Sequence, residues 1–474
     1  MAAAENITTG DTEQRKEIKL SLCLSVSPVV KLSASMPQQF NYWLTTVQLP
    51  IPPAPPPPES ADVAIIGAGF TGLSAALALA KRGAKVVVLE SETIGWGASS
   101  RNGGMVLTGL KLGVNQLIAK YGRDLTRRMY AASLETVDVV ERIVKEETIA
   151  CDFVRTGHLE VACKQAHFDD YARQGEVIAR EFNHRLCVVP RNQLRGEIGS
   201  DIYYGGMVDE ISAGLNPARY VAGLAVAAIR AGAQISEHTR LHNIQRQSRD
   251  GAPGFKLNSS RGAIWARNVL VGTSGYTGVA TPALRKKIIP IGSFIITTEV
   301  LSDALTRELS PRNRQIYDSK NYLYYYRLTP DNRMLFGGRA AFFPETDQTI
   351  RRSAEILRCG MIEVYPQLGD TKIEYVWGGT LDFCFDMMPH AGQLDGIYFA
   401  LGYAGHGVAM ATYQGQKMAE WIAEGTADGK HASRKTDNPF TEIPFPGAPL
   451  GLYGGKPWFL PFAGAYYKVL DWVS

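Results

Sequence analysis

Three glycines and one acidic residue near the start of the chain have the types and the spacing of a nucleotide site. Gly67, Gly69 and Gly72 form the pattern G-x-G-x-x-G, and Glu90 ends the next apolar run. In this motif the first glycine permits a tight turn, the second lets the backbone approach a pyrophosphate, and the third lets a helix pack closely on a strand. A carboxylate in the position of Glu90 can accept hydrogen bonds from ribose hydroxyls. The sequence therefore predicts a dinucleotide site, with a glycine-rich turn that binds no ligand as the alternative.

The flanking residues supply the elements that must position these groups. Residues 61–66, ADVAII, form a short run rich in β-branched residues, which suits a buried parallel strand. Residues 71–82 form an apolar helix whose positive end is aimed at the phosphates. Phe70 and Thr71, at the start of that helix, are therefore candidate cofactor-binding residues. Residues 85–90, KVVVLE, are the second strand.

A second loop, residues 91–106, is rich in backbone N–H groups and hydroxyls. Its sequence, SETIGWGASSRNGGMV, can wrap a diphosphate and then lie against a flat ring. A nicotinamide-binding domain does not need such a loop directly after its second strand. An ordinary polar turn is the alternative for its serines and asparagine. The candidate cofactor-binding residues of this loop are Gly97, Ala98, Ser99, Ser100, Asn102, Gly103, Gly104 and Met105.

At this loop the sequence resembles the FAD-dependent oxidoreductases of the D-amino-acid oxidase, glycine oxidase and sarcosine oxidase superfamily. Residues 95–104, GWGASSRNGG, look most like the gamma-glutamylputrescine oxidase branch, and the resemblance covers residues 40–474. Some relatives carry a histidine in this loop that is joined covalently to the flavin. This loop has Trp96 and no histidine. The resemblance therefore implies non-covalent FAD.

The fold implied by the resemblance is α/β, with a discontinuous Rossmann-type FAD-binding domain and an antiparallel-sheet substrate domain. A flexible extension with a polyproline spacer precedes them, and an irregular tail follows. The expected boundaries are 1–59 for the extension, 60–150, 205–280 and 370–435 for the FAD-binding domain, 151–204 and 281–369 for the substrate domain, and 436–474 for the tail.

A distant segment repeats the order of strand, glycine turn and helix. Residues 397–401 are the strand, 402–407 (GYAGHG) the turn, and 408–425 the helix. In the family this turn faces the pyrimidine edge of the flavin, where helix-end N–H groups stabilise the negative charge of the reduced ring. His406 could add a donor, or it could be a capping or structural histidine. The candidate residues here are Gly405, Gly407, Val408 and Ala409 for cofactor binding, and His406 for catalysis.

Three more candidate cofactor-binding residues come from the middle of the chain. In the family the strand after the helix opened by Pro217 contributes a residue against the adenine, and Leu241 is the best match. Packing in the core is its alternative reading. A later turn closes over the nucleotide in relatives, which makes Thr273 and Gly275 candidates.

A run of tyrosines on one predicted strand could line an amine pocket. Because side chains alternate along a strand, Tyr322, Tyr324 and Tyr326 share one face, and Tyr325 and Arg327 share the other. We name Tyr324 and Tyr326 as candidate catalytic residues, with ordinary aromatic packing on a strand as the alternative.

Two departures from the family pattern bear on substrate and flavin attachment. D-amino-acid oxidases carry an arginine that pairs with the substrate carboxylate, but residues 373–383, IEYVWGGTLDF, contain none. Arg327 or Arg339 could replace that clamp. Monomeric sarcosine oxidases attach flavin to a cysteine at the position of Tyr375, whereas Cys384 reads as a buried thiol.

The implied reaction is oxidation of an amine C–N bond. The C–H next to nitrogen passes a hydride to flavin N5, the imine hydrolyses, and oxygen or an electron-transfer partner reoxidises the flavin. One alternative is a glycine, sarcosine or D-amino-acid oxidase or dehydrogenase. Another, of a different class, is a flavin-binding sensor or subunit without turnover.

Composition narrows the possible partners and the cellular location of the protein. The net charge of the 474 residues is only +4, and charges of both signs are intermixed, which argues against nucleic acid as a partner. The six cysteines show no C-x-x-C spacing, which indicates reduced thiols, a cytoplasmic protein and no metal site.

No apolar run reaches the roughly 18 residues of a membrane span. The aromatic tail could still touch a membrane surface. Residues 20–30 faintly resemble a secretory signal, with a disordered extension or a start at Met36 as alternatives.

Overall fold

The computed structural model describes residues 37–48, 56–338, 346–427 and 437–473. The chain divides into the units Met1–Pro37 and Gln38–Ser474, and every helix and strand named below belongs to the second. Most of the expected N-terminal extension and Arg339 lie outside the described residues.

The first of two eight-stranded sheets has a parallel centre built from segments far apart in the sequence. Strand β1 pairs in parallel with β2 on one side and with β11 on the other, and β11 pairs in parallel with β18. The sheet order is β17-β18-β11-β1-β2-β8, with β10 and β9 added beside β11. The bounds are β1 Ser60–Ile66, β2 Val86–Leu89, β8 Gln234–Ser236, β9 Leu241–Arg246, β10 Phe255–Ser259, β11 Gly262–Val271, β17 His390–Leu394 and β18 Ile397–Leu401.

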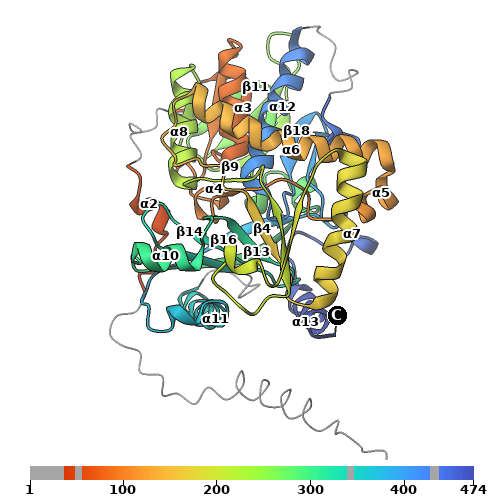
Figure 1. Cartoon of the computed structure of the whole chain (residues 1–474). Helices are drawn as coiled ribbons and strands as arrows, with labels where there is room; N and C mark the ends of the chain where they lie inside the picture. Colours follow the sequence, from red (N-terminus) through yellow and green to blue (C-terminus); the bar gives the residue numbers. More distant parts are fainter. Residues whose placement is uncertain (1–36, 49–55, 339–345, 428–436, 474) are drawn as a thin grey trace, which may run out of the picture. The chain divides into compact units, whose positions relative to one another are not determined.

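Helices pack on this sheet through small residues. Helix α3 (Phe70–Lys81) lies between α8 (Pro217–Arg230) and α12 (Gly407–Ala427), and Figure 1 shows the three side by side. A Cβ atom at Gly415 would lie 2.4 Å from the Thr71 carbonyl oxygen, so α12 can approach α3 only because this residue is glycine. Helices α5 (Val114–Tyr121) and α6 (Arg123–Glu146) add the outer layer.

The second sheet also has eight strands, in the order β16-β12-β15-β14-β13-β4-β6-β5. Its pairs are antiparallel except for β13 and β4, which run parallel. Helix α11 (Asp347–Val364) packs on β12, β15 and β16, and Figure 1 shows it beside the sheet. The bounds are β4 His158–Val161, β5 Cys187–Pro190, β6 Gly205–Asp209, β12 Ile289–Thr298, β13 Gln315–Asp318, β14 Tyr324–Leu328, β15 Met334–Gly338 and β16 Ile373–Phe383.

The two faces of the second sheet have different neighbours. Tyr326 and Phe336 lie on the face that packs against α11, in one apolar core with Leu357. Tyr325 lies on the opposite face, in a separate cluster with Trp377. Because side chains alternate along a strand, residues of β14 with even numbers face α11 and those with odd numbers face the opposite side.

Short elements connect the two sheets. The loop expected over residues 91–106 contains helix α4 (Ala98–Arg101) and strand β3 (Met105–Val106), which pairs with β7 (Ala213–Gly214). Helix α2 (Tyr42–Thr45) caps its own start through Asn41 and buries Trp43 against the same region. Three further helices are α7 (Gln165–Phe182), α9 (Pro282–Arg285) and α10 (Asp303–Leu309).

The carboxyl-terminal tail differs from expectation. Residues 436–474 were expected to be irregular, but helix α13 (Leu460–Val473) closes the chain. Its sequence LPFAGAYYKVLDWV contains one glycine and a leading proline, which a helix tolerates in its first turn. Within the described ranges, every helix is too short or too polar to cross a membrane.

Candidate functional site

The carboxyl ends of β1 and β11 open into a cavity of about 310 Å³. Three glycine-rich turns line it: the turn after β1, the segment around α4, and the turn between β18 and α12. An opening at the carboxyl ends of parallel strands is the usual position of a ligand site in an α/β sheet. The candidate residues that line the cavity are Gly67, Gly69, Phe70, Thr71, Glu90, Gly97, Ala98, Ser99, Asn102, Leu241, Thr273, Gly405, Gly407 and Val408.

The turn after β1 is held open by its glycines. Gly67 has a φ of +101°, and its N–H donates to the Leu89 carbonyl oxygen at 2.9 Å. A Cβ atom at Gly69 would lie 2.7 Å from the Ser99 hydroxyl oxygen, so a side chain there would fill the space beside the helix start. Gly69 gives helix α3 no side-chain cap, but the Phe70 N–H donates to the Ser99 hydroxyl at 3.0 Å, and Phe70 and Thr71 line the cavity. This end of α3 is therefore suited to bind an anion such as a diphosphate.

Glu90 stands at the cavity wall with its carboxylate fixed. It accepts hydrogen bonds from the N–H groups of Ala68, at 2.8 Å, and Glu92, at 2.9 Å. Burial raises the pKa of Glu90, and these hydrogen bonds oppose the rise. Oε1 accepts from the Glu92 N–H and the Ser91 hydroxyl, whereas Oε2 accepts from the Ala68 N–H and has a second lone pair that can still accept from a ribose hydroxyl.

A buried carboxylate organises the turn between β18 and α12. Asp382 accepts hydrogen bonds from the N–H groups of Gly402, at 2.6 Å, and Tyr403, at 3.2 Å. The Tyr403 hydroxyl in turn shares a 2.6 Å hydrogen bond with Thr71 on α3. Asp382 also lines the cavity. It therefore ties the third turn to the second sheet and to the first turn.

His406 is half-buried at the start of α12, beside the cavity-lining Gly405 and Gly407. Its Nδ1 atom is buried and has no hydrogen-bond partner among the described residues. Burial, together with the positive charge of Lys111 and His158, lowers the pKa of His406 to about 4. The ring is therefore neutral near pH 7, and its orphaned nitrogen indicates a missing ligand group.

Several candidates lie behind the cavity wall and act through packing. A Cβ atom at Gly72 would lie 1.9 Å from the Gly67 carbonyl oxygen, so this glycine fixes the helix against the strand. Ser100 is fully buried, and its hydroxyl accepts a hydrogen bond from the Asn41 amide. Ala409 is buried in the core around α12. A direct cofactor contact for these residues stays a prediction.

Four other candidates face the second sheet. A Cβ atom at Gly103 would lie 3.2 Å from the Tyr325 ring, and one at Gly104 would lie 2.1 Å from the Leu215 carbonyl oxygen. A Cβ atom at Gly275 would lie 2.8 Å from the Leu381 carbonyl oxygen. Met105 begins β3. These residues make the boundary between the cavity and the second sheet, and their contact with the flavin also stays a prediction.

The tyrosines named as catalytic candidates face away from this boundary. Tyr326 is fully buried, stacks on Phe336 and donates its hydroxyl to that of Tyr203 at 2.8 Å. Tyr324 packs on the same face, against Phe336 and Gly360 of α11. The tyrosine of this strand that lies toward the cavity boundary is Tyr325, so this placement disfavours Tyr324 and Tyr326, whose catalytic role stays a prediction. The period of two was read correctly, but the sequence did not reveal which face α11 covers.

The cavity includes residues that sequence reasoning did not name as candidates. Trp96 and Tyr276 meet edge to face with ring centroids 5.5 Å apart, at the outer wall of the cavity. Asp382 could have been noticed as an acid near the end of strand β16, shortly after Gly378 and Gly379. The remaining ones include Ser91, Thr239, Arg240, His242, Thr281 and Tyr403.

One group of potential metal ligands occurs among the described residues, although the sequence predicted no metal site. Cys384, Asp386 and His390 place ligand atoms within 4.8 Å of one another. The His390 Nε2 atom is hydrogen-bonded to Asp386 at 2.9 Å, and the ring stacks on Phe445. These contacts account for the group as a structural histidine–carboxylate pair.

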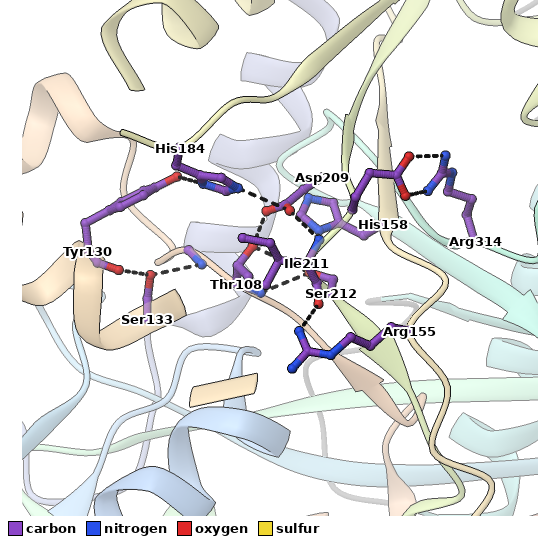
Figure 2. A network of polar contacts seen from close by, with 12 residues as sticks. Thr108, Tyr130, Ser133, Arg155, His158, His184, Asp209, Ile211, Ser212 and Arg314 are labelled. Carbon is purple, nitrogen blue, oxygen red and sulfur yellow. Dashed lines mark hydrogen bonds and ion pairs between the residues drawn. The ribbon is translucent and has the colours of Figure 1, made fainter. Parts of the chain in front are cut away.

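A second polar network lies on the second sheet (Figure 2). Asp209 accepts hydrogen bonds from the Thr108 hydroxyl at 2.5 Å and from the Ile211 N–H at 2.9 Å, and it contacts His184 Nε2 at 3.3 Å. Burial alone would raise the pKa of Asp209, but these hydrogen bonds and the neighbouring histidines lower it to about 2. The network joins the loop after β3 to β4 and β6, next to the boundary described above.

Comparison with known proteins decides the family. The model of the family described as "FAD dependent oxidoreductase" (DAO) matches residues 62–421, well over half of the chain. The chain belongs to this family. It is 33% identical over 415 residues to gamma-glutamylputrescine oxidoreductase from Escherichia coli, covering 86% of this chain and 92% of that protein. It is 36% identical over 370 residues to the probable oxidoreductase OrdL from Haemophilus influenzae, covering 77% and 83%.

Solved structures of the DAO family share the fold. The crystal structure of glycine oxidase from Geobacillus kaustophilus superposes with a TM-score of 0.66 at 18% identity, covering 81% of this chain and 99% of that chain. The predicted family, the α/β fold class and the oxidoreductase activity on amines or amino acids are confirmed. Membership of the DAO family also supports FAD as the cofactor.

Proposed function

We propose that this DAO-family chain binds FAD non-covalently and oxidises an amine of the gamma-glutamylputrescine type. The observation that carries the proposal is the single cavity bounded by three glycine turns from three distant parts of the sequence. Two of these turns each open a helix, α3 and α12. This arrangement offers one helix end to a diphosphate and another to the far end of a long cofactor.

The residues present fit FAD. Gly69 leaves the backbone at the start of α3 accessible from the cavity, and the Ser99 hydroxyl, which accepts from the Phe70 N–H at 3.0 Å, would donate its own proton to a phosphate oxygen. Glu90 would hold the ribose, Gly67 to Thr71 the diphosphate, and the start of α12 the pyrimidine edge. The orphaned Nδ1 atom of His406 would gain a partner there. When bound, FAD accepts the hydride removed from the carbon next to the amine nitrogen.

The chain's own groups would stabilise charge and exclude water. The N–H groups and dipole at the start of α12 favour negative charge at the adjacent ring edge. Tyr325 and Trp377 cover the boundary from the second sheet, and the Trp377 indole N–H donates to the Arg101 carbonyl oxygen at 3.1 Å. We assign no general base, because an amine that enters neutral needs none.

The side chains at the relevant positions support non-covalent attachment. Trp96 lies in the loop where some relatives carry the linking histidine, and Tyr375 occupies the position of the linking cysteine. Cys384 is buried, and burial raises the pKa of its thiol well above the usual range, which keeps it protonated and unreactive. A brief acid precipitation should therefore release all FAD into the supernatant.

The substrate class rests on the relative's name and on the missing carboxylate clamp. Strand β16 carries no arginine. Arg327 is buried, and two of its nitrogens hold backbone: Nη1 donates to the carbonyl oxygens of Gly104, at 2.8 Å, and Leu215, at 3.1 Å, and Nε donates to that of Leu328 at 3.1 Å. These bonds tie Arg327 to the backbone and disfavour a two-pronged grip on a substrate carboxylate. This favours an amine over a simple α-amino acid.

Turnover with matched substrates tests the proposal. We expect gamma-glutamylputrescine to reduce the bound flavin anaerobically at least about tenfold more efficiently, as kcat/KM, than sarcosine or D-alanine. Faster reduction by sarcosine or D-alanine would overturn the substrate class and favour the amino-acid oxidase alternative. Following reoxidation with oxygen and with an artificial electron acceptor separates oxidase from dehydrogenase. We also propose a cytoplasmic protein, supported by five free cysteines in the described residues.

A further inference from the structure

One row of side chains crosses the second sheet toward the cavity boundary. Glu160 on β4 stands opposite Tyr317 on β13, which stands opposite Tyr325 on β14. Tyr325 in turn lies against Gly103, in the segment expected to lie along the flavin. Adjacent strands are about 4.8 Å apart, so Glu160 is roughly 10 Å from Tyr325 along this row. The row therefore leads from the proposed flavin position to a carboxyl group.

The carboxyl group of Glu160 is half-buried, and its polar neighbours are the phenol groups of Tyr171 and Tyr317. Burial raises its pKa, while the positive charge of Lys111 and the phenol groups of Tyr171 and Tyr317 oppose the rise. It forms no ion pair within the described part of the chain. A carboxylate withdrawn from water in this way is stabilised most by a cation that is brought to it.

Tyr171 supplies an independent sign of a missing ligand. This residue of α7 is 3% exposed and packs with Met207. Its hydroxyl is buried without a direct hydrogen-bond partner among the described residues. Met207 stands opposite Glu160 on the neighbouring strand, so the phenol group of Tyr171 lies beside Glu160, whose charge raises the pKa of Tyr171 further after burial itself. An unsatisfied buried hydroxyl beside a carboxyl group indicates a polar group that binds both.

The polar network of Figure 2 reaches this place through His158. His158 contacts the Ser212 hydroxyl at 2.8 Å through Nδ1 and the Tyr317 hydroxyl at 3.3 Å through Nε2. The positive charge of Lys111 lowers the pKa of both Glu160 and His406, and His158 also lowers the pKa of His406. Glu160 and the proposed flavin-binding turn therefore adjoin one polar region.

We propose that Glu160, together with Tyr171 and Tyr317, binds a positively charged nitrogen at the end of the substrate remote from the oxidised carbon. The enzyme is then selective for amines that carry a second ammonium group. This inference rests on the proposed function, because the oxidised carbon must lie at the flavin. The phenol rings add cation–π attraction and the carboxylate adds an ion pair.

Binding to the reduced holoenzyme tests this site without turnover. The flavin is first reduced with dithionite, and putrescine, butylamine and 4-aminobutanoate are titrated anaerobically by calorimetry. These probes share a 3-aminopropyl chain and differ only in the group at its end, which is an ammoniomethyl, a methyl or a carboxylate group. Wild type is compared with Glu160→Gln, Tyr171→Phe and the control Glu176→Gln, an exposed carboxylate on α7. Absorbance of the oxidised flavin and the melting temperature verify that each variant is folded.

We expect the wild type to bind putrescine about tenfold or more tightly than butylamine or 4-aminobutanoate, and Glu160→Gln to remove most of that preference. Tyr171→Phe lowers putrescine affinity by a smaller factor, and Glu176→Gln leaves it unchanged. A Glu160→Gln variant that keeps the wild-type preference for putrescine overturns the inference, as does an equal loss for all three probes. The proposed function fails separately, if no amine bleaches the oxidised flavin.

Discussion

The two eight-stranded sheets carry their functional groups in different ways. In the first sheet the candidate groups follow directly after parallel strands, as short turns whose backbone N–H groups and glycines form the cavity wall. In the second sheet they are side chains on one face, spaced two residues apart and spread over several strands. A site made of backbone groups can be recognised in the sequence from closely spaced glycines. For a site made of side chains on one sheet face, the sequence does not reveal which face is available, because that depends on what covers the other face.

Adjacent residues of β14 show this difference at its smallest scale. Tyr326 is enclosed by the core under α11, and Tyr325 faces the segment around α4. They are neighbours in sequence and identical in type, yet only one can take part in the site. The predictions below compare the two sheets and then the two faces, beginning with the largest expected effect.

Closing the turn of the first sheet should be the most damaging change. In Gly72→Ala the new Cβ atom would meet the Gly67 carbonyl oxygen at 1.9 Å, so α3 must move away from β1. We expect a loss of about 4 kcal/mol or more in the free energy of unfolding, and no bound FAD. The control is Gly175→Ala in α7 at the second sheet, where the nearest atom to a new Cβ is 4.0 Å away. That variant should keep FAD and gain about 0.5–1 kcal/mol, as measured by thermal and denaturant unfolding.

Removing the ribose anchor should weaken the cofactor without unfolding the protein. Glu90→Ala loses the acceptor for the Ala68 and Glu92 N–H groups and for the ribose. The dissociation constant of FAD, measured by fluorescence on reconstitution of the apoprotein, should rise about tenfold to a hundredfold. Glu59→Ala, an exposed carboxylate just before β1, is the control and should leave it unchanged. An unchanged constant in Glu90→Ala would remove this residue from the cofactor site.

The two faces of β14 should separate stability from activity. Tyr326→Phe removes a buried hydrogen bond to Tyr203, so the free energy of unfolding should fall by about 1–2 kcal/mol while kcat and KM for the amine stay unchanged. Tyr325→Phe removes a hydroxyl at the boundary and should alter KM or the rate of flavin reduction with little change in stability. Steady-state kinetics and denaturant unfolding on both variants check this contrast. The opposite pattern would place the substrate on the α11 face.

The smallest expected effect concerns acid sensitivity at His406. Its pKa is lowered to about 4 in the folded protein, against about 6.5 for an unfolded histidine. Between these values the unfolded chain binds more protons, so this contribution to stability is present above pH 6.5 and is lost as the pH falls toward 4. His406→Asn should therefore flatten the fall in melting temperature over this range. Part of the fall should remain, because burial also lowers the pKa of His158.

The sequence predicts the first sheet well because local signals and long-range packing agree there. The strand, turn and helix around Gly67 to Glu90 occur as expected, and fourteen of the cofactor-binding candidates line the cavity. Asp382 was missed because its role depends on two backbone N–H groups twenty residues later, at Gly402 and Tyr403. Glu160 and Tyr171 were missed for a related reason, since they meet only when α7 packs beside β6. Such contacts have no periodicity that a sequence could reveal.

Anaerobic titration of the purified yellow protein with gamma-glutamylputrescine tests the central claim most directly. We predict that the flavin absorbance near its visible maximum bleaches with one equivalent of the amine, and that an aldehyde and ammonia form in equal amount. Protein that binds FAD but is not bleached by this amine, sarcosine, D-alanine or putrescine would contradict an amine oxidase and support a flavin-binding protein without turnover. Protein that binds no FAD would contradict the site itself.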